Sequence, residues 1–337
     1  MSVLTLSNDE YKKFPDICKD YAVYSHGIKG NSEKTVCEYL LDIRTFLRFY
    51  LAKKQSLEMS AKSLETISIS EIGIDDIRSI NQRLIYEFLS FIGANRKNKP
   101  STRMRKLSAL KSFFRYLHKK QAIIDFDPTA DVDAPKKGST LPKFLTVEES
   151  VRLLEAIKND NESKTIKRDY AMISIFLNTG MRLSELVGLN LESFDRALTQ
   201  VTVVGKGNKE RLIYINQAAR SAIEDYLRVR LDPKHIRTSN KAFFLSQREN
   251  RISAKTVQYI VYKYLKLAGL GSRKMSVHKL RHTAATLMYQ SGKVDVRVLK
   301  DILGHEQLNT TQIYTHVIDR NMEEAVEANP LADIKIK

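Results

Sequence analysis

The sequence predicts a mainly helical chain with one small β-sheet, an α+β fold divided into two domains. Three observations support this fold class. A length of 337 residues is more than one average domain needs and suggests about two. Apolar residues recur over most of the chain at the spacing of a helical face. One pair of β-branched runs flanks a glycine-containing turn, which predicts a β-hairpin.

Composition excludes several classes of protein. Hydrophobic residues make up 42% of the chain, which is ordinary for a globular protein, and 13 Gly with 7 Pro exclude collagen-like and low-complexity chains. Cys18 and Cys37 cannot form a disulfide framework, and metal-binding CxxC pairs are absent from the sequence. The N-terminus lacks the apolar region of a signal peptide, and no apolar run reaches the roughly 18 residues of a membrane span. We therefore expect a cytoplasmic protein without membrane contact.

The charge balance indicates a polyanionic partner. Lys and Arg number 56 against 39 Asp and Glu, a formal net charge of +17. Such an excess attracts polyanions, of which nucleic acid is the commonest in a cytosol. A generally basic surface without a polyanion ligand is the alternative.

The first domain, residues 1–125, is predicted to be helical. Residues 35–50 show one clear apolar face, residues 64–80 show a weaker pattern, and residues 84–92 form a short apolar stretch. The next helix is expected to start near Pro100 with Ser101 as its N-cap. The apolar positions of the first and last of these helices are Val36, Leu40, Ile43, Leu47 and Tyr50, and Met104, Leu107, Leu110, Phe114 and Leu117.

Residues 96–120 carry ten basic residues and no acidic one. An ordinary solvated helix face mixes both signs, because like charges one turn apart repel. We therefore predict a surface that contacts phosphates, with a merely solvated face as the alternative. Phosphate contacts would position the protein on DNA without reading its sequence. The ten residues are Arg96, Lys97, Lys99, Arg103, Arg105, Lys106, Lys111, Arg115, Lys119 and Lys120.

Residues 126–144, rich in Pro and without apolar periodicity, predict an extended linker. The second domain, residues 145–337, is expected to open with a capping box at Thr146-Val-Glu-Glu149 and a helix with Val151, Leu154 and Ile157 on its apolar face. A helix over residues 168–178 should end at Gly180. A hairpin is predicted over residues 200–204 and 211–215, followed by helices at residues 217–230, 254–268, 277–290 and 294–303.

Five local features of this second domain carry side chains suited to phosphate chemistry. Arg182 lies at a turn between helices, and Lys206 lies at the tip of the hairpin. His278 and Arg281, three residues apart, share one helical face. His305 follows a helix end, and Tyr314 comes nine residues later.

Each of these residues also has an ordinary structural explanation, such as an ion pair between Arg182 and Glu185. Taken together they offer guanidiniums, an ammonium, imidazoles and a phenol, the groups that a metal-free attack on a phosphodiester requires. Arginine stabilises charge on phosphate oxygens, a tyrosine oxygen can be the nucleophile, and Lys or His can protonate the leaving alkoxide. Spacing alone cannot place six side chains around one phosphate.

The residues of these motifs and their order along the chain resemble the tyrosine recombinase, or phage-type integrase, family, and most closely its Xer-like bacterial branch. The matching stretches are TGMRLSEL (179–186), GKGNKER (205–211), HKLRHTAAT (278–286) and LGHEQLNTTQIYTH (303–316). The resemblance covers the whole chain, and the N-terminal domain resembles the family's helical core-binding domain. The segment 55–80 is longer than in the compact Xer pattern, which leaves its role open.

The resemblance implies a role for each site residue. Tyr314 would attack the scissile phosphate and form a 3′-phosphotyrosyl bond, releasing a 5′-hydroxyl. Arg182 and Arg281 would clamp the non-bridging oxygens. Lys206 would be the general acid, and His278 would assist proton transfer at the tyrosine.

Further residues of the motifs would support these groups. His305 would hydrogen-bond the phosphate, and Glu185 would hold the arginine. Lys209 is the rival for the role of Lys206. His282 and His316 are expected to pack or to orient their neighbours.

The resemblance implies a two-domain C-shaped clamp on a double-stranded DNA recombination site, acting as a homotetramer without metal, ATP or other cofactor. A partner recombinase or accessory proteins could join it. The function implied is site-specific recombination, either Xer-like chromosome dimer resolution or integration and excision of a mobile element. A type IB topoisomerase-like DNA-relaxing enzyme and a non-catalytic DNA-binding protein are the alternatives.

Overall fold

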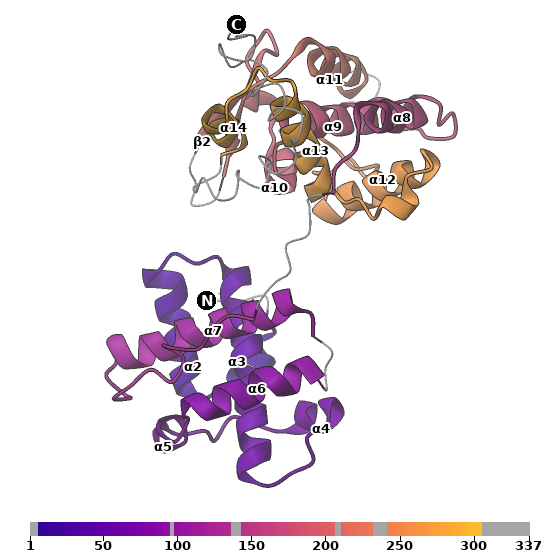
Figure 1. The fold of residues 1–337 in the computed structure, drawn as a ribbon. Helices are drawn as coiled ribbons and strands as arrows, with labels where there is room; N and C mark the ends of the chain where they lie inside the picture. Colours follow the sequence, from indigo (N-terminus) through magenta and orange to yellow (C-terminus); the bar gives the residue numbers. More distant parts are fainter. Residues whose placement is uncertain (1–5, 95–97, 136–142, 206–209, 232–240, 305–337) are drawn as a thin grey trace, which may run out of the picture. The chain divides into compact units, whose positions relative to one another are not determined.

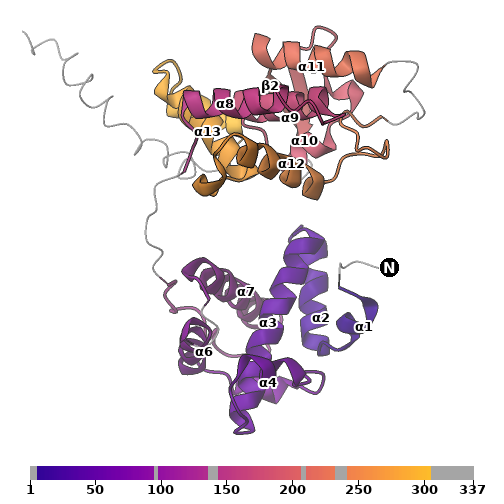
Figure 2. The same cartoon turned by 90° about the vertical axis from the view of Figure 1, so that its right-hand side faces the viewer.

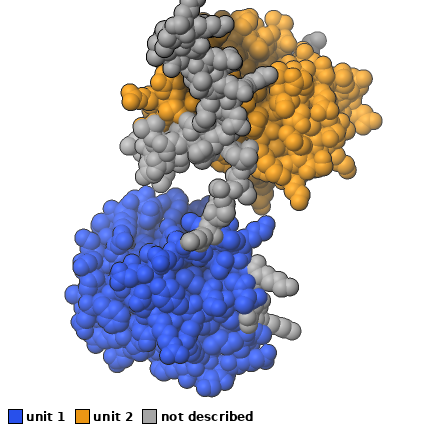
Figure 3. Space-filling model, viewed as in Figure 1, with its two compact units in different colours: residues 1–139 blue, residues 140–337 orange. Residues whose placement is uncertain are grey.

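The computed structural model describes residues 6–94, 98–135, 143–205, 210–231 and 241–304 (Figure 1). The chain forms two compact units, residues 1–139 and 140–337, coloured separately in Figure 3. This division falls inside the segment 126–144 that was expected to be a linker. Within the described residues, no helix is long and apolar enough to cross a membrane.

The regular elements in the described part of unit 1 are all helices. Its two longest helices, α3 (Glu33–Lys54) and α7 (Pro100–Lys119), pack against each other, and α6 (Gln82–Ala94) packs on both. The five apolar residues predicted for residues 35–50 are all buried. The remaining elements are α1 (Asn8–Lys12), α2 (Asp16–Val23), a π-helical turn (Tyr24–Ile28), α4 (Ala61–Thr66) and α5 (Ile74–Arg78).

Two expectations for unit 1 were wrong in detail. Lys99, not Ser101, is the N-cap of α7, and Pro100 is its first residue. Proline suits that position because its fixed φ is helical and its missing N–H would have no partner there. The expected linker is also not extended from its start, because Thr129 and Val132 are buried in unit 1.

The basic segment of residues 96–120 does not point all its charges outward. The buried carboxylate of Asp42 accepts hydrogen bonds from Arg105 Nη1 at 2.6 Å and from Lys106 Nζ at 2.7 Å. These two cations therefore compensate a charge inside unit 1. The exposed cations of the described part of the segment are Lys99, Arg115, Lys119 and Lys120.

Unit 2 is built around α9 (Ile166–Thr179), which packs against α8 (Val147–Lys158), α11 (Gln217–Arg230) and α13 (Val277–Gln290) (Figures 1 and 2). The predicted capping box is confirmed, since Thr146 Oγ1 accepts from Glu149 N and the Glu149 carboxylate accepts from Thr146 N. The predicted apolar face of α8 is wrong at one position. Val151 is 46% exposed, and Leu153 is buried instead.

The predicted hairpin is confirmed as β1 (Gln200–Val204) and β2 (Glu210–Tyr214), which pair antiparallel with Val203 opposite Arg211. The other helices in the described part of unit 2 are α10 (Leu183–Gly188), α12 (Ala254–Leu267) and α14 (Val296–Leu303), with short 3₁₀ turns at Leu191–Ser193 and Gly271–Arg273. The observed architecture, mainly helical with a small sheet, matches the predicted fold class.

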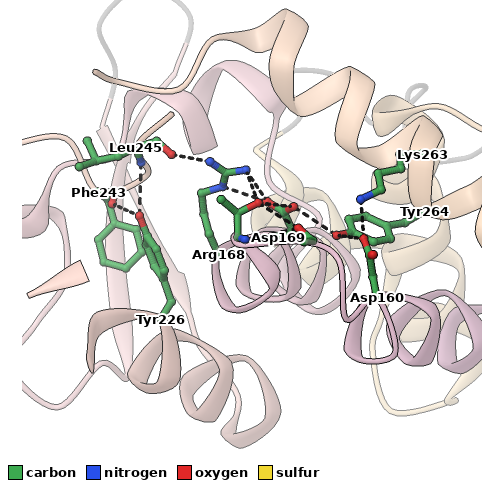
Figure 4. Close-up of polar contacts among 10 residues, drawn as sticks. Asp160, Arg168, Asp169, Tyr226, Phe243, Leu245, Lys263 and Tyr264 are labelled. Carbon is green, nitrogen blue, oxygen red and sulfur yellow. Dashed lines mark hydrogen bonds and ion pairs between the residues drawn. The ribbon is translucent and has the colours of Figure 1, made fainter. Parts of the chain in front are cut away.

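A buried polar network joins α9 to α12 and to the strand-like segment at Leu245 (Figure 4). Asp169 pairs with Arg168, whose Nη1 donates to Leu245 O at 2.8 Å. Tyr264 of α12 donates to the carboxylates of both Asp169 and Asp160, and Lys263 pairs with Asp160. This network connects elements distant in sequence and satisfies its buried charges internally.

Candidate active site

The turn that carries Arg182 follows from two residues of its motif. Gly180 ends α9 with φ of +63°, a left-handed conformation that glycine adopts without steric cost. Arg182 is then the N-cap of α10, and Glu185 Oε2 accepts a hydrogen bond from Arg182 N at 2.7 Å. The Arg182 side chain turns back as well, because its Nη1 donates to Glu185 Oε1 at 2.9 Å. The sharp turn therefore holds a half-exposed guanidinium at the end of α9.

Arg281 is fixed beside this turn by backbone carbonyls. It is buried on α13, where its Nη1 donates to Gly180 O at 2.7 Å and its Nη2 donates to Leu303 O at 2.6 Å. Gly180 thus both permits the turn before Arg182 and accepts from Arg281. The packing of α9 against α13 brings together two arginines that lie about one hundred residues apart in sequence.

Arg182, His278 and Arg281 line one pocket of about 570 Å³. Three of the six predicted site residues therefore meet at one place. The pocket is also lined by Ser184 and by Gln258 and Tyr262 of α12. The other three predicted residues, Lys206, His305 and Tyr314, lie outside the described residues. The same is true of Lys209 and His316.

The surroundings of His278 disfavour the charged form of its imidazole. Burial lowers the pKa of His278, and the nearby charges of Arg281 and Arg182 lower it further. The ring of His282 lies edge-to-face against it, with 4.7 Å between ring centroids. Burial, together with His278 and Arg281, lowers the pKa of His282 to about 4. A neutral imidazole has one nitrogen that accepts a proton, so His278 can act as a base at neutral pH.

Glu185 is the carboxylate that holds two arginines of the site. It is buried, and it pairs with Arg182 and also with Arg211 of β2, whose Nη2 lies 2.8 Å from Glu185 Oε2. Burial raises the pKa of Glu185, but the hydrogen bond from Arg182 N and the charge and hydrogen bonds of Arg211 and Arg182 outweigh it, so the pKa lies below its usual value. An ionised Glu185 facing Arg182, Arg211 and the nearby Arg281 leaves the described part of the site with excess positive charge.

Sequence reasoning assigned no role to Arg211. It belongs to the matching stretch GKGNKER, but only the lysines of that stretch were considered. A signal was available, because side chains two residues apart on a strand point to the same face. Arg211 shares its face with Ile213 and Ile215, which are both buried, and a cation on a buried face needs a charged partner.

Comparisons with known proteins identify the family to which the chain is similar. Residues 143–321 match the model of the phage integrase family, and residues 61–121 match the phage integrase N-terminal SAM-like domain. The chain is 46% identical over 327 residues to a protein named tyrosine recombinase XerC from Caldanaerobacter subterraneus subsp. tengcongensis, covering 97% of this chain and 90% of the relative.

Solved structures share the fold. The XerH site-specific recombinase bound to palindromic difH substrate aligns with a TM-score of 0.69 at 22% identity, over 97% of this chain and 90% of that one. A lambda integrase tetramer bound to a Holliday junction aligns with a TM-score of 0.62 at 16% identity, over 89% and 76%. Part of the 61–121 match lies within segment 55–80, so the end of that longer segment belongs to the N-terminal domain.

Proposed function

Because this chain belongs to the phage integrase family, we propose that its pocket on α13 holds the scissile phosphate of a DNA strand and that Tyr314 attacks it. The protein is a site-specific tyrosine recombinase, an enzyme that cuts and rejoins DNA. The assignment of residues to steps is our proposal. The observation that carries it is the convergence of Arg182, His278 and Arg281 on one pocket with excess positive charge.

The reaction balances with the groups of this chain. The Tyr314 oxygen forms a bond to phosphorus, the bond from phosphorus to the 5′-oxygen breaks, and Lys206 supplies the proton that the 5′-oxygen needs. His278 accepts the proton of the tyrosine. Arg182 and Arg281 stabilise the charge that grows on the non-bridging oxygens, an effect that is usually the largest single contribution to such catalysis.

Rejoining needs no external energy source in this scheme. The phosphotyrosyl ester conserves the energy of the broken phosphodiester, and attack by a 5′-hydroxyl reverses the first step. We therefore propose a reaction without ATP, metal or another cofactor. His305 would donate a hydrogen bond to the phosphate, and Lys209 is the alternative to Lys206 as the acid.

The proposed partner is a double-stranded DNA recombination site. The exposed cations at the end of α7 support this, because Lys and Arg on one helix attract the phosphate backbone. The proposed assembly is a homotetramer on two sites, which the shared fold with a junction-bound lambda integrase tetramer supports. It would act on DNA in the cytoplasm.

For the biological role we propose chromosome dimer resolution. The extent of the likeness to XerC, over nearly the whole chain, favours this role over integration and excision of a mobile element. The test is to trap the protein on genomic DNA and to sequence what is bound. One chromosomal site would support the proposal, whereas the ends of a mobile element would contradict it.

The proposed chemistry is tested with a nicked substrate that loses its 5′-hydroxyl end after cleavage and so traps the covalent intermediate. The wild-type protein should give a protein–DNA adduct that survives denaturation. Tyr314→Phe removes one oxygen and should bind DNA with unchanged affinity while forming no adduct. An adduct with the Phe variant would place the nucleophile elsewhere, and relaxation of plasmids without a recombination site would favour a topoisomerase.

A further inference from the structure

Three consecutive carbonyl groups at the end of α14 each accept a hydrogen bond from an arginine of a different element. Arg211 Nη1 lies 2.6 Å from Ile302 O, Arg281 Nη2 lies 2.6 Å from Leu303 O, and Arg182 Nη2 lies 2.6 Å from Gly304 O. The last carbonyls of a helix have no donor within the helix, and they form the negative end of its dipole. Guanidinium groups from β2, α13 and the N-cap of α10 thus hold the end of α14 in place by hydrogen bonds.

Arg211 differs from the other two arginines in what else it contacts. Arg182 and Arg281 line the pocket, whereas Arg211 approaches Glu185 from the side of the hairpin. One guanidinium group therefore connects β2, Glu185 and the end of α14. Glu185 also forms an ion pair with Arg182, which lines the pocket. Arg211 therefore contacts the carboxylate that orients a pocket arginine.

Gly304 gives independent evidence that Arg211 is closely packed. Its φ of +64° is the left-handed conformation that ends α14. A Cβ built on Gly304 would lie 2.7 Å from both Cδ and Nε of Arg211, closer than side chains approach one another. The side chain of Arg211 therefore occupies the space that any residue other than glycine would need.

We propose that Arg211 is a positioning residue of the active site, which fixes Arg182 through Glu185 and fixes the end of α14 through Ile302. The inference rests on the proposed function, because it assumes that Arg182 binds the scissile phosphate. The two backbone segments that Arg211 connects, β2 and the end of α14, each lie close in sequence to a predicted catalytic residue. In sequence, β1 and β2 flank Lys206, and the chain continues from Gly304 directly to His305.

A position-setting role differs from a purely stabilising one in what its loss changes. Misplacing a catalytic group by about 1 Å can reduce a rate about a hundredfold without weakening binding. A purely stabilising arginine lowers the melting temperature and leaves the rate of the folded enzyme unchanged. Arg168 is the matched control, since it is buried in the same unit, pairs with a carboxylate and donates to a backbone carbonyl away from the pocket (Figure 4).

The experiment compares Arg211→Lys with Arg168→Lys. Lysine keeps the charge but lacks the planar fork that reaches two acceptors at once. Adduct formation is measured in a single turnover at saturating nicked DNA, well below the melting temperature of each variant. The DNA carries either a phosphodiester or a methylphosphonate at the scissile position. The methylphosphonate has no negative charge on the non-bridging atoms, so it depends less on Arg182.

We expect Arg211→Lys to bind DNA within about twofold of wild type and to cleave the phosphodiester at least about tenfold more slowly. Its rate loss should be smaller on the methylphosphonate. Arg168→Lys should melt at a lower temperature and cleave both substrates at the wild-type rate. Equal rate losses for the two variants, or an equal loss of Arg211→Lys on both substrates, would overturn the inference.

A second pair of variants covers the case in which Arg211→Lys does not fold. Gly304→Ala pushes on Arg211, whereas Gly269→Ala adds a Cβ at a similar φ of +72° with nothing within 4 Å. We expect the substrate-dependent rate loss for Gly304→Ala and a loss of stability alone for Gly269→Ala. The same rate for both would contradict the positioning role. Failure of the wild type to form an adduct, or an adduct with Tyr314→Phe, would instead contradict the proposed function.

Discussion

Two arginine–carboxylate networks in unit 2 use the same chemistry in opposite ways. Asp169 is buried with Arg168, and Tyr264 and Thr165 donate further hydrogen bonds to it. Glu185 is equally buried but pairs with two arginines, and one of them, Arg182, is partly exposed at a pocket. The first network compensates its charges internally. The second keeps more positive than negative charge, which is what a phosphate-binding site requires.

The pKa shifts of the two carboxyls follow this difference. Burial raises the pKa of Asp169, and the charge and hydrogen bonds of Arg168 compensate only part of that effect. Burial acts on Glu185 in the same direction, but the hydrogen bond of Arg182 N and the charge of Arg211 outweigh it and lower its pKa. The comparison teaches that a backbone N–H and two guanidiniums together lower the pKa of a buried carboxyl, and that the second guanidinium leaves positive charge for a ligand.

We call the Asp169 network, in which the charges compensate one another, the closed network. Removing its buried carboxylate, Asp169, should have the largest effect on stability. Asp169→Ala leaves the guanidinium of Arg168 buried without its hydrogen-bonding partner. Breaking a buried pair in this way costs about 3–5 kcal/mol of unfolding free energy. Denaturant unfolding of unit 2 measures the loss, and adduct formation at low temperature should remain at the wild-type rate. A slowed adduct with a small loss of stability would make Asp169 part of the reacting site.

The pH dependence of stability should separate the two carboxyls by sign. The folded-state pKa of Glu185 is lowered, so its stabilising contribution is present above its usual pKa near 4.5 and is lost as the pH falls through the folded value. The advantage of wild type over Glu185→Gln should therefore shrink as the pH falls below about 4.5.

Asp169 should show the reverse behaviour. Its folded-state pKa is raised above 3.8, so stability is greatest with the carboxyl protonated and is lost as the pH rises through the folded value. The advantage of wild type over Asp169→Asn should shrink as the pH rises from about 3.8 towards neutrality. Denaturant unfolding between acidic and neutral pH measures both variants, and parallel curves would contradict the assigned environments.

The same comparison can be extended to unit 1, where Asp42 compensates Arg105 and Lys106. Replacing the exposed cations Lys99, Arg115, Lys119 and Lys120 by glutamine should reduce the logarithmic salt slope of DNA binding by about 0.9 for each phosphate that is no longer neutralised. Arg105→Gln should destabilise unit 1 and change that slope by less than one phosphate's share. Binding titrations over a range of salt concentrations decide it, and an unaltered slope in the fourfold variant would show that these cations face only water.

The smallest effect is expected at the solvent-facing edge of the closed network. Lys263 pairs with Asp160 but remains partly exposed. Pairs of this kind contribute about 0–1 kcal/mol, because water screens them and two side chains must be ordered. Lys263→Met should therefore change the unfolding free energy by less than about 1 kcal/mol. A larger loss would show that the Asp160 end of the network is shielded from water as well as the Asp169 end.

The predictable part of this molecule is its local structure. The apolar face of residues 35–50, the capping box at Thr146, the helix end at Gly180 and the hairpin each depend on a few neighbouring residues, and each is confirmed. The errors were also local. Val151 lies three residues before Leu154, and Leu153 lies four residues before Ile157, so both fit a helical face. α8 packs against α9 and α12, and in this packing Leu153 is buried while Val151 is exposed.

The site was predictable only in part from the residues themselves. Spacing placed His278 and Arg281 on one helical face, but the meeting of Arg182 with Arg281 depends on the packing of α9 on α13. The prediction that these two arginines act together came from the family resemblance and not from periodicity. Arg211 was missed because its role appears only when the hairpin, Glu185 and the end of α14 are seen together.

The central claim, that the Glu185 network serves the phosphate and the Asp169 network serves the fold, is tested most directly by one rate measurement on matched variants. Arg182→Ala and Arg168→Ala are compared with wild type for covalent adduct formation in a single turnover at saturating nicked DNA, at a temperature where all three are folded. Loss of one group that stabilises transition-state charge costs about 10²–10³ in rate, and we predict this loss for Arg182→Ala. Arg168→Ala should form the adduct at the wild-type rate despite its lower melting temperature. Equal rates for the two variants would contradict the account.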